Sequence, residues 1–304
     1  MTFLEIKQRI AEQLGISSAD TTTDANATIA AKLTEWVNAR YRVLAGKRSW
    51  NWLIKDSIVQ TVVDVTTGTV TATLGSANIT FSTGPTLSAA GWFIQFSDSN
   101  DWYEISTHTA AATAAVMTVP YLGTTSSTLT YVLRKVYYAL PTDTNKILNI
   151  SQHRVWNTTL QYIPARILDQ YESLRNSIGR PRFYSISGVD SSRQYKMELF
   201  PTPDVAMNLN VRRYCIVAEL SADGDVPVIP EAFHDILVWD VLSTYGFTWL
   251  DDTRISSAKA EFNNLYDDLV KNDVATEDIP VRMPFDMNLT GTSEILDNYD
   301  LPII

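Results

Sequence analysis

The sequence predicts an α+β protein: a helical framework that carries an inserted antiparallel β barrel or sandwich, a small β meander and an extended C-terminal arm. Three observations lead to this prediction. Apolar residues recur at helical spacing near both ends of the chain, β-branched and aromatic residues dominate residues 50–140, and periodicity stops after Asn272. The expected divisions are a framework at 1–49 and 141–273, with a meander at about 182–215, a β insertion at 50–140 and an arm at 274–304.

Two helices are predicted at the N-terminus. Thr2 and Glu5 have the spacing of a capping box, and Gly15 suits the end of the helix that follows them. After a polar loop at 17–24, a second helix ends at Gly46. Its apolar stripe consists of Ile29, Leu33, Trp36, Val37, Tyr41 and Leu44.

The β insertion is predicted from short alternating segments separated by turn residues. Glycine, proline, asparagine or aspartate marks the breaks, as at Gly84-Pro85. Short strands at this spacing are typical of a small antiparallel barrel or sandwich. The predicted strands lie at about 57–63, 69–74, 79–81, 92–96, 103–105, 115–119 and 129–133.

The framework resumes with a strand at about 146–152 and a helix at about 164–177, which starts with Pro164 in its first turn. The alternative is one long helix from residue 152 with a kink at Pro164. Gly179 and Pro181 stop this helix. Strands at 182–187, 195–200 and 208–215 then form the predicted meander.

A pair of helices is predicted to organise the C-terminal half. Pro230 and Glu231 suit the first turn of a helix that runs to about Tyr245. Gly246 and the run 251–253 mark the break, and a second helix covers 255–270.

The arm combines three prolines with scattered apolar residues, which a free disordered tail would usually lack. We expect it to become ordered on a partner; folding back on its own subunit is the alternative. The expected anchors are Phe285, Met287, Leu289, Ile295, Leu296, Tyr299 and Leu301.

Composition excludes several classes of protein. The net charge of −10 argues against non-specific binding of duplex DNA through basic side chains. Cys215 is the only cysteine, so the chain has no intrachain disulfide and no multi-cysteine zinc site. No apolar run approaches the roughly 18 residues of a membrane span.

Catalytic motifs are missing from the sequence. It contains no G-x-S-x-G, P-loop, G-x-G-x-x-G or H-E-x-x-H pattern, and its three histidines lie far apart. We therefore expect no catalytic residues, no metal site and no cofactor, and a protein that is not an enzyme.

Two groups of residues leave alternatives open. Trp50, Trp52, Trp92, Trp102 and Tyr103 suit core packing or a subunit interface on one reading and a sugar-stacking platform on the other. A basic group at the end of the second helix either interacts favourably with the negative end of the helix dipole or, if that end lines a channel, faces a phosphate backbone. This basic group consists of Arg40, Arg42, Lys47 and Arg48.

The order of these pieces, together with several short phrases, resembles the head-to-tail adaptor proteins of short-tailed bacteriophages, also called connector, collar or tubular tail proteins. The resemblance covers about residues 28–270. The phrases are Tyr-Tyr-Ala-Leu-Pro-Thr-Asp at 137–143, Gly-Arg-Pro-Arg-Phe-Tyr at 179–184, Leu-Phe-Pro-Thr-Pro-Asp at 199–204, Val-Arg-Arg-Tyr at 211–214 and the stretch 223–234 that enters a helix.

The resemblance implies a virion protein of the head–tail junction, made and assembled in the cytoplasm of the host bacterium. It implies a ring of twelve subunits beneath the portal protein. Such a ring extends the channel for double-stranded DNA, which passes without sequence-specific binding, and docks the next tail or nozzle protein. The alternatives are a carbohydrate-binding or carbohydrate-acting virion component and a fibre-type receptor-binding protein.

Overall fold

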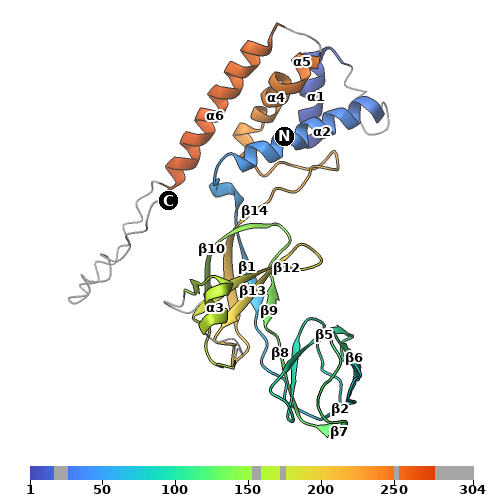
Figure 1. Cartoon of the computed structure of the whole chain (residues 1–304). Coiled ribbons are helices and arrows are strands. Elements are labelled where there is room, and N and C mark those ends of the chain that lie inside the picture. The colour runs from blue at the N-terminus through green and yellow to red at the C-terminus, as the bar shows by residue number, and fades with distance from the viewer. Residues whose placement is uncertain (17–26, 153–158, 172–175, 250–252, 278–304) are drawn as a thin grey trace, which may run out of the picture. The chain divides into compact units, whose positions relative to one another are not determined.

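The computed structural model describes residues 1–16, 27–152, 159–171, 176–249 and 253–277 (Figure 1). The chain divides into two compact units, one of residues Met1–Val37 with Ile229–Ile304, the other of Asn38–Val228. The first unit is helical and the second contains the three β-sheets, so the predicted α+β class is confirmed.

Helix α1 (Phe3–Leu14) has the predicted start and stop. The Thr2 hydroxyl accepts from the backbone N–H of Glu5, the Glu5 carboxylate accepts from the N–H of Thr2, and Gly15 ends the helix in a left-handed conformation, with φ of 69°. Its apolar face packs on helix α4 (Asp235–Val241). Helix α2 (Ala27–Gly46) ends at the predicted glycine and continues from the first unit into the second.

The C-terminal helices differ in detail from the prediction. A 3₁₀ turn at Glu231–Phe233 precedes α4, so the α-helix starts at Asp235 rather than near Pro230. A π turn at Leu242–Gly246 then continues into the short helix α5 (Phe247–Trp249), so Gly246 does not break the helical path. A Cβ added to Gly246 would lie 3.2 Å from side-chain carbons of Leu14 and Leu242, which shows that this glycine permits close packing.

Helix α6 (Ile255–Glu277) packs against α4, as Figure 1 shows. It extends seven residues beyond the predicted end at 270 and includes residues 274–277 of the predicted arm. The rest of the arm lies outside the described residues.

A seven-stranded antiparallel sheet forms a nearly closed barrel in the second unit, in the order β7-β2-β3-β6-β5-β4-β8. Strands β7 and β8, at the two ends of this order, follow each other in the chain with only Thr130 between them. Because β7 pairs with β2 and β8 pairs with β4, this bent segment nearly closes the barrel. The strands are β2 (Val70–Ala72), β3 (Asn78–Phe81), β4 (Phe93–Phe96), β5 (Trp102–His108), β6 (Ala114–Met117), β7 (Ser126–Leu129) and β8 (Tyr131–Arg134).

Two further sheets enclose a separate core. One has the order β1-β14-β10, from Ile54–Gln60, Asn208–Cys215 and Thr144–Gln152. The other has the order β11-β12-β13-β9, from Gln161–Tyr162, Phe183–Val189, Tyr195–Phe200 and Tyr137–Ala139. The shared core contains Tyr138 from one sheet and Val211 from the other. Helix α3 (Ala165–Tyr171), shorter in the described residues than the predicted 164–177, packs on β12.

The predicted meander is corrected by these pairings. Strands β12 and β13 form a hairpin, but β14 pairs with β1 and β10 in the other sheet. The connection at 201–207 includes Pro201 and Pro203, which lack the N–H needed to continue a ladder beside β13. Strand β1, which lies in the range of the predicted insertion, likewise pairs with β14 and not with the barrel. The domain limits drawn from the sequence stay a prediction.

Candidate functional site

The basic residues predicted to face a channel lie at the end of α2 and directly after it. Arg42 forms an ion pair of 3.2 Å with Glu219, and both side chains are more than half exposed. The guanidinium carbon of Arg48 lies 5.9 Å from the ring centroid of Trp50, whose indole N–H donates to the carbonyl of Leu44. Residues 40 and 42 are two positions apart in a helix and so do not share a face.

The loop that contacts this end of α2 is held by buried hydrogen bonds. The Asn38 side chain donates to the Leu220 carbonyl and accepts from the Leu220 N–H, both at 2.9 Å. The Tyr41 hydroxyl accepts from the N–H of Val228 at 2.8 Å. Within the loop, backbone N–H groups of Ala222 and Ser221 donate to Asp225 and hold the pKa of its carboxyl below the usual value. These contacts give the basic end of α2 a fixed protein neighbour.

A second feature of the β-rich unit is an open seam between strands β1 and β9. Within the described residues, β1 pairs only with β14 and β9 only with β13. At the far side the two sheets connect, because Ser151 bridges Thr159 and the N–H of Leu160 donates to the Ile150 carbonyl. The seam is thus the place where the two sheets do not join.

One end of the seam is closed where the chain enters and leaves the barrel. Val65 and Leu133 exchange two backbone hydrogen bonds of 2.9 Å. The Tyr138 hydroxyl lies 3.3 Å from the backbone nitrogen of Val62. Beyond these contacts the strands separate and leave a groove of about 390 Å³, lined among others by Ile58, Gln60, Lys135, Ala139, Pro141 and Gln194.

The groove combines an exposed apolar residue with a partly buried cation. Ile58 is 57% exposed although it lies in a strand. The Lys135 ammonium lies 5.0 Å from the ring centroid of Tyr138 and 5.9 Å from that of Trp92. Burial lowers the pKa of Lys135. Within the described part of the chain no carboxylate pairs with Lys135, so the groove presents a cation without an anionic partner.

A smaller cavity of about 300 Å³ lies beside Cys215 in the same unit. Asp143 accepts from Arg213 at 2.8 Å and lies 3.4 Å from the Lys55 ammonium, while Arg213 also donates to the Cys215 sulfur. Burial raises the pKa of the Cys215 thiol. A buried thiol with a raised pKa is a poor nucleophile, so this cluster has the character of a structural core.

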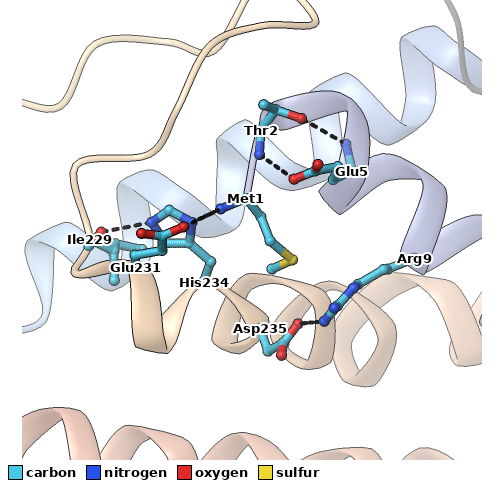
Figure 2. Close-up of polar contacts among 8 residues, drawn as sticks. All are labelled: Met1, Thr2, Glu5, Arg9, Ile229, Glu231, His234 and Asp235. Atoms are coloured by element: carbon cyan, nitrogen blue, oxygen red, sulfur yellow. Dashed lines mark hydrogen bonds and ion pairs between the residues drawn. The ribbon is translucent and has the colours of Figure 1, made fainter.

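In the helical unit, His234 joins the N-terminus to the start of α4 (Figure 2). The α-amino group of Met1 lies 2.8 Å from Nδ1 of His234, and Nε2 lies 2.8 Å from the carbonyl oxygen of Ile229. An ammonium can only donate, so Nδ1 accepts and Nε2 carries the proton donated to Ile229. Arg9 also pairs with Asp235. The ring nitrogens of this 1%-exposed histidine are therefore engaged in holding α1 against α4.

The aromatic residues considered for sugar stacking do not form an exposed row. Trp50, Trp92 and Tyr103 are at most 5% exposed, and Trp92 and Tyr103 belong to the barrel core. Trp52 stacks on Trp50 with centroids 5.8 Å apart. The Arg134 guanidinium covers the ring of Trp102 at 4.8 Å. Core packing is thus the arrangement observed for this group.

Other site predictions fall outside what the structure describes. The seven expected anchors of the arm, residues 285–301, are among the residues not described. Over the described ranges, no three His, Cys, Asp or Glu side chains gather in a way that would hold a metal ion. Nor does any helix in those ranges have the length and apolar character needed to cross a bilayer.

The seam was missed from the sequence because it depends on which strands pair. Strand β9 has three residues, too few for a period-2 pattern to stand out. The available signal was Lys135 between apolar segments, which does not by itself predict a groove.

Comparison with known proteins assigns the chain to a family. No curated protein matches the chain. The family described as SU10 adaptor protein matches residues 1–284, which is most of the 304 residues. All the described helices, the barrel and the second β core lie within the matched range. The chain therefore belongs to the SU10 adaptor protein family, and it is a structural head-to-tail adaptor of the bacteriophage virion.

Proposed function

We propose that this adaptor forms a closed ring beneath the portal protein of a short-tailed phage and docks the downstream tail or nozzle protein. The family match supports this proposal most directly. A ring needs two different surfaces on each subunit, because a head-to-tail contact closes only when each copy binds the next through complementary patches. Twelve copies, assembly in the host cytoplasm and a final place at the head–tail junction are parts of the same proposal.

The ring extends the DNA channel without recognising sequence. The chain has a net charge of −10, and an acidic channel wall would repel the phosphates of the duplex and let DNA slide. Arg40, Arg42, Lys47 and Arg48 supply local positive charge if the end of α2 faces the channel. The Arg42–Glu219 pair reduces the charge available at one of these positions.

The arm provides docking to the portal or to a neighbouring subunit through its apolar residues. The proposed division into framework, β insertion and arm then assigns ring formation and docking to separate parts of the chain. In this division the framework covers 1–49 and 141–273, the insertion 50–140 and the arm 274–304.

Two measurements test the proposal. Light scattering of the purified protein, alone and with the portal, should give the mass of a ring or of a portal–ring complex. Phage particles that lack the protein should contain heads without tails. A protein that stays monomeric with the portal, together with complete tails on the deficient particles, would show the proposal to be wrong.

A further inference from the structure

The open seam between β1 and β9 has the properties of a site for an added strand. Edge strands present unpaired backbone N–H and C=O groups, which pair readily with an extended segment. The seam has two such edges, at β1 and at β9, in the described part of the chain. A single inserted strand would satisfy both edges and join the two sheets.

The pairings also define the directions of the strands. Strand β1 is antiparallel to β14, which is antiparallel to β10. On the far side of the two sheets, the Ser151–Thr159 bridge joins β10 to the segment that leads into β11 and is antiparallel. Strands β11 and β12 are parallel, whereas the pairs β12–β13 and β13–β9 are antiparallel. Hence β1 and β9 run in opposite directions, and an added strand would be parallel to one and antiparallel to the other, as in mixed sheets.

The groove sets the chemistry of the strand that fits it. Val59 and Tyr138 face the core, whereas Ile58, Gln60 and Ala139 face outward. A suitable strand therefore has apolar residues at alternate positions for the inner face. It also carries negative charge, because Lys135 lacks a carboxylate partner among the described residues.

One segment of this chain has that pattern. Residues 285–289 read Phe-Asp-Met-Asn-Leu, with apolar and polar residues in strict alternation after Pro284. The stretch 278–304 contains five acidic residues and one basic residue, Arg282, so its side chains complement Lys135. The acidic residues are Asp278, Asp286, Glu294, Asp297 and Asp300.

We propose that residues 285–289 of one copy insert as a strand into the β1–β9 seam of a second copy. The proposal rests on the proposed ring, because a subunit that offers both a strand and a seam makes a head-to-tail contact that can close around a ring. In this insertion Phe285, Met287 and Leu289 would face the core beside Val59 and Tyr138. Asp286 and Asn288 would then be on the outer face, on the same side as Ala139 and Ile58.

Disulfide cross-linking between two singly substituted proteins tests this insertion. Ala139→Cys is placed in one preparation and Asn288→Cys, or Asp286→Cys, in the other, in the full-length chain. The native Cys215 is 2% exposed and is kept in all proteins. After mild oxidation of the mixture, a dimer should appear on a non-reducing gel and disappear with reductant. The matched control replaces Ala139→Cys by Thr128→Cys, an exposed position in β7, and should give no dimer.

Each outcome decides the proposal. A dimer with Ala139→Cys but not with Thr128→Cys supports it, and Met287→Asp in the segment-bearing protein should then lower the apparent affinity about tenfold or more. A disulfide that forms only when both cysteines are in one chain shows that the strand returns to its own subunit, which overturns the proposal. If rings form but Ala139→Cys is cross-linked to the segment neither between copies nor within one chain, the strand insertion is wrong while the adaptor function still stands. Failure to form rings or bind the portal contradicts the adaptor function itself.

Discussion

Val65 and Leu133 exchange a pair of backbone hydrogen bonds at the point where the chain enters and leaves the barrel. The seven barrel strands β2–β8 lie between residues 70 and 134, so the barrel begins and ends near this pair. Its core residues form a cluster distinct from the core between the other two sheets. The barrel is thus connected to the rest of the unit through two adjacent strands of chain.

Because Val65 and Leu133 form a mutually hydrogen-bonded antiparallel pair, the barrel can be replaced by a two-residue hairpin turn. We predict that a protein with Asn-Gly in place of residues 66–132, and Leu133→Thr to avoid an exposed apolar side chain, keeps its helices and its second β core. Circular dichroism should show cooperative melting with undiminished helical signal. Attachment of later tail components to the ring should be impaired, because we expect the insertion to contact neighbouring subunits or tail parts.

The comparison for this deletion is a variant that removes residues 63–137 and joins Val62 directly to Tyr138. That connection also deletes the Val65–Leu133 pair and the Asp64–Arg134 ion pair, and it should fold less well. If both shortened proteins are unfolded, the barrel belongs to the same cooperative core as the rest of the unit.

Asp64 and Arg134 form a buried ion pair beside the same point. The Asp64 carboxylate accepts from Nε and Nη2 of Arg134 at 2.7–3.1 Å, and the two side chains are 12% and 4% exposed. Arg134→Met leaves a largely buried carboxylate unpaired, so we predict a loss of about 3–5 kcal/mol in the free energy of unfolding. The double variant Asp64→Leu/Arg134→Met should recover most of it, because no charge is left buried.

Urea unfolding measures these changes, and the chain offers a matched control. Arg212 makes the same kind of two-point contact with Asp56, at 3.0 and 3.2 Å, but both side chains are about half exposed. Arg212→Met should cost only about 0–1 kcal/mol. Equal losses for the two arginine variants would show that burial does not determine the contribution of the Asp64–Arg134 pair.

The sequence predicted those elements whose start, period and stop agree locally. Helix α1 is such a case, because Thr2, Glu5 and Gly15 act within a few residues of the segment they bound. Most barrel strands were also located, since alternation reports which side of a strand is buried. Alternation does not identify the partner strand, so the pairing of Ile54 with Tyr214, far away in the chain, could not be derived.

The candidate site was predicted less well for the same reason. The basic residues at the end of α2 could be read from the sequence, but the ion pair of Arg42 with Glu219 depends on tertiary structure. Whether a strand lies at an open sheet edge depends on how all the strands pair, so the sequences of β1 and β9 alone do not reveal it. The alternating apolar residues of the arm were visible in the sequence, whereas the groove proposed to receive them was not.

Tyr138, at the closed end of the seam, leads to a prediction about alkaline pH. Its side chain is 1% exposed, and burial together with the nearby charge of Asp64 raises its pKa to about 12, although the hydrogen bond with the Val62 backbone acts in the opposite direction. An unfolded tyrosine has a pKa of about 10. Between these values the folded protein holds a proton that the unfolded chain has lost, so the contribution of Tyr138 to stability is complete below about pH 10 and is lost as pH rises toward about 12.

Tyr138→Phe removes the ionisable hydroxyl, so residue 138 no longer makes the free energy of unfolding depend on pH. We predict that the free energy of unfolding of the variant falls less steeply above pH 10 than that of the wild type, by up to about 1.4 kcal/mol per pH unit. Near pH 7 the variant should be less stable by about 1 kcal/mol, because it lacks the hydroxyl that contacts Val62. Urea unfolding of both proteins from about pH 7 to 11.5 measures both effects. Curves that stay parallel through the alkaline range would mean that Tyr138 ionises equally readily in the folded and unfolded chains, and that the seam is open to water at this end.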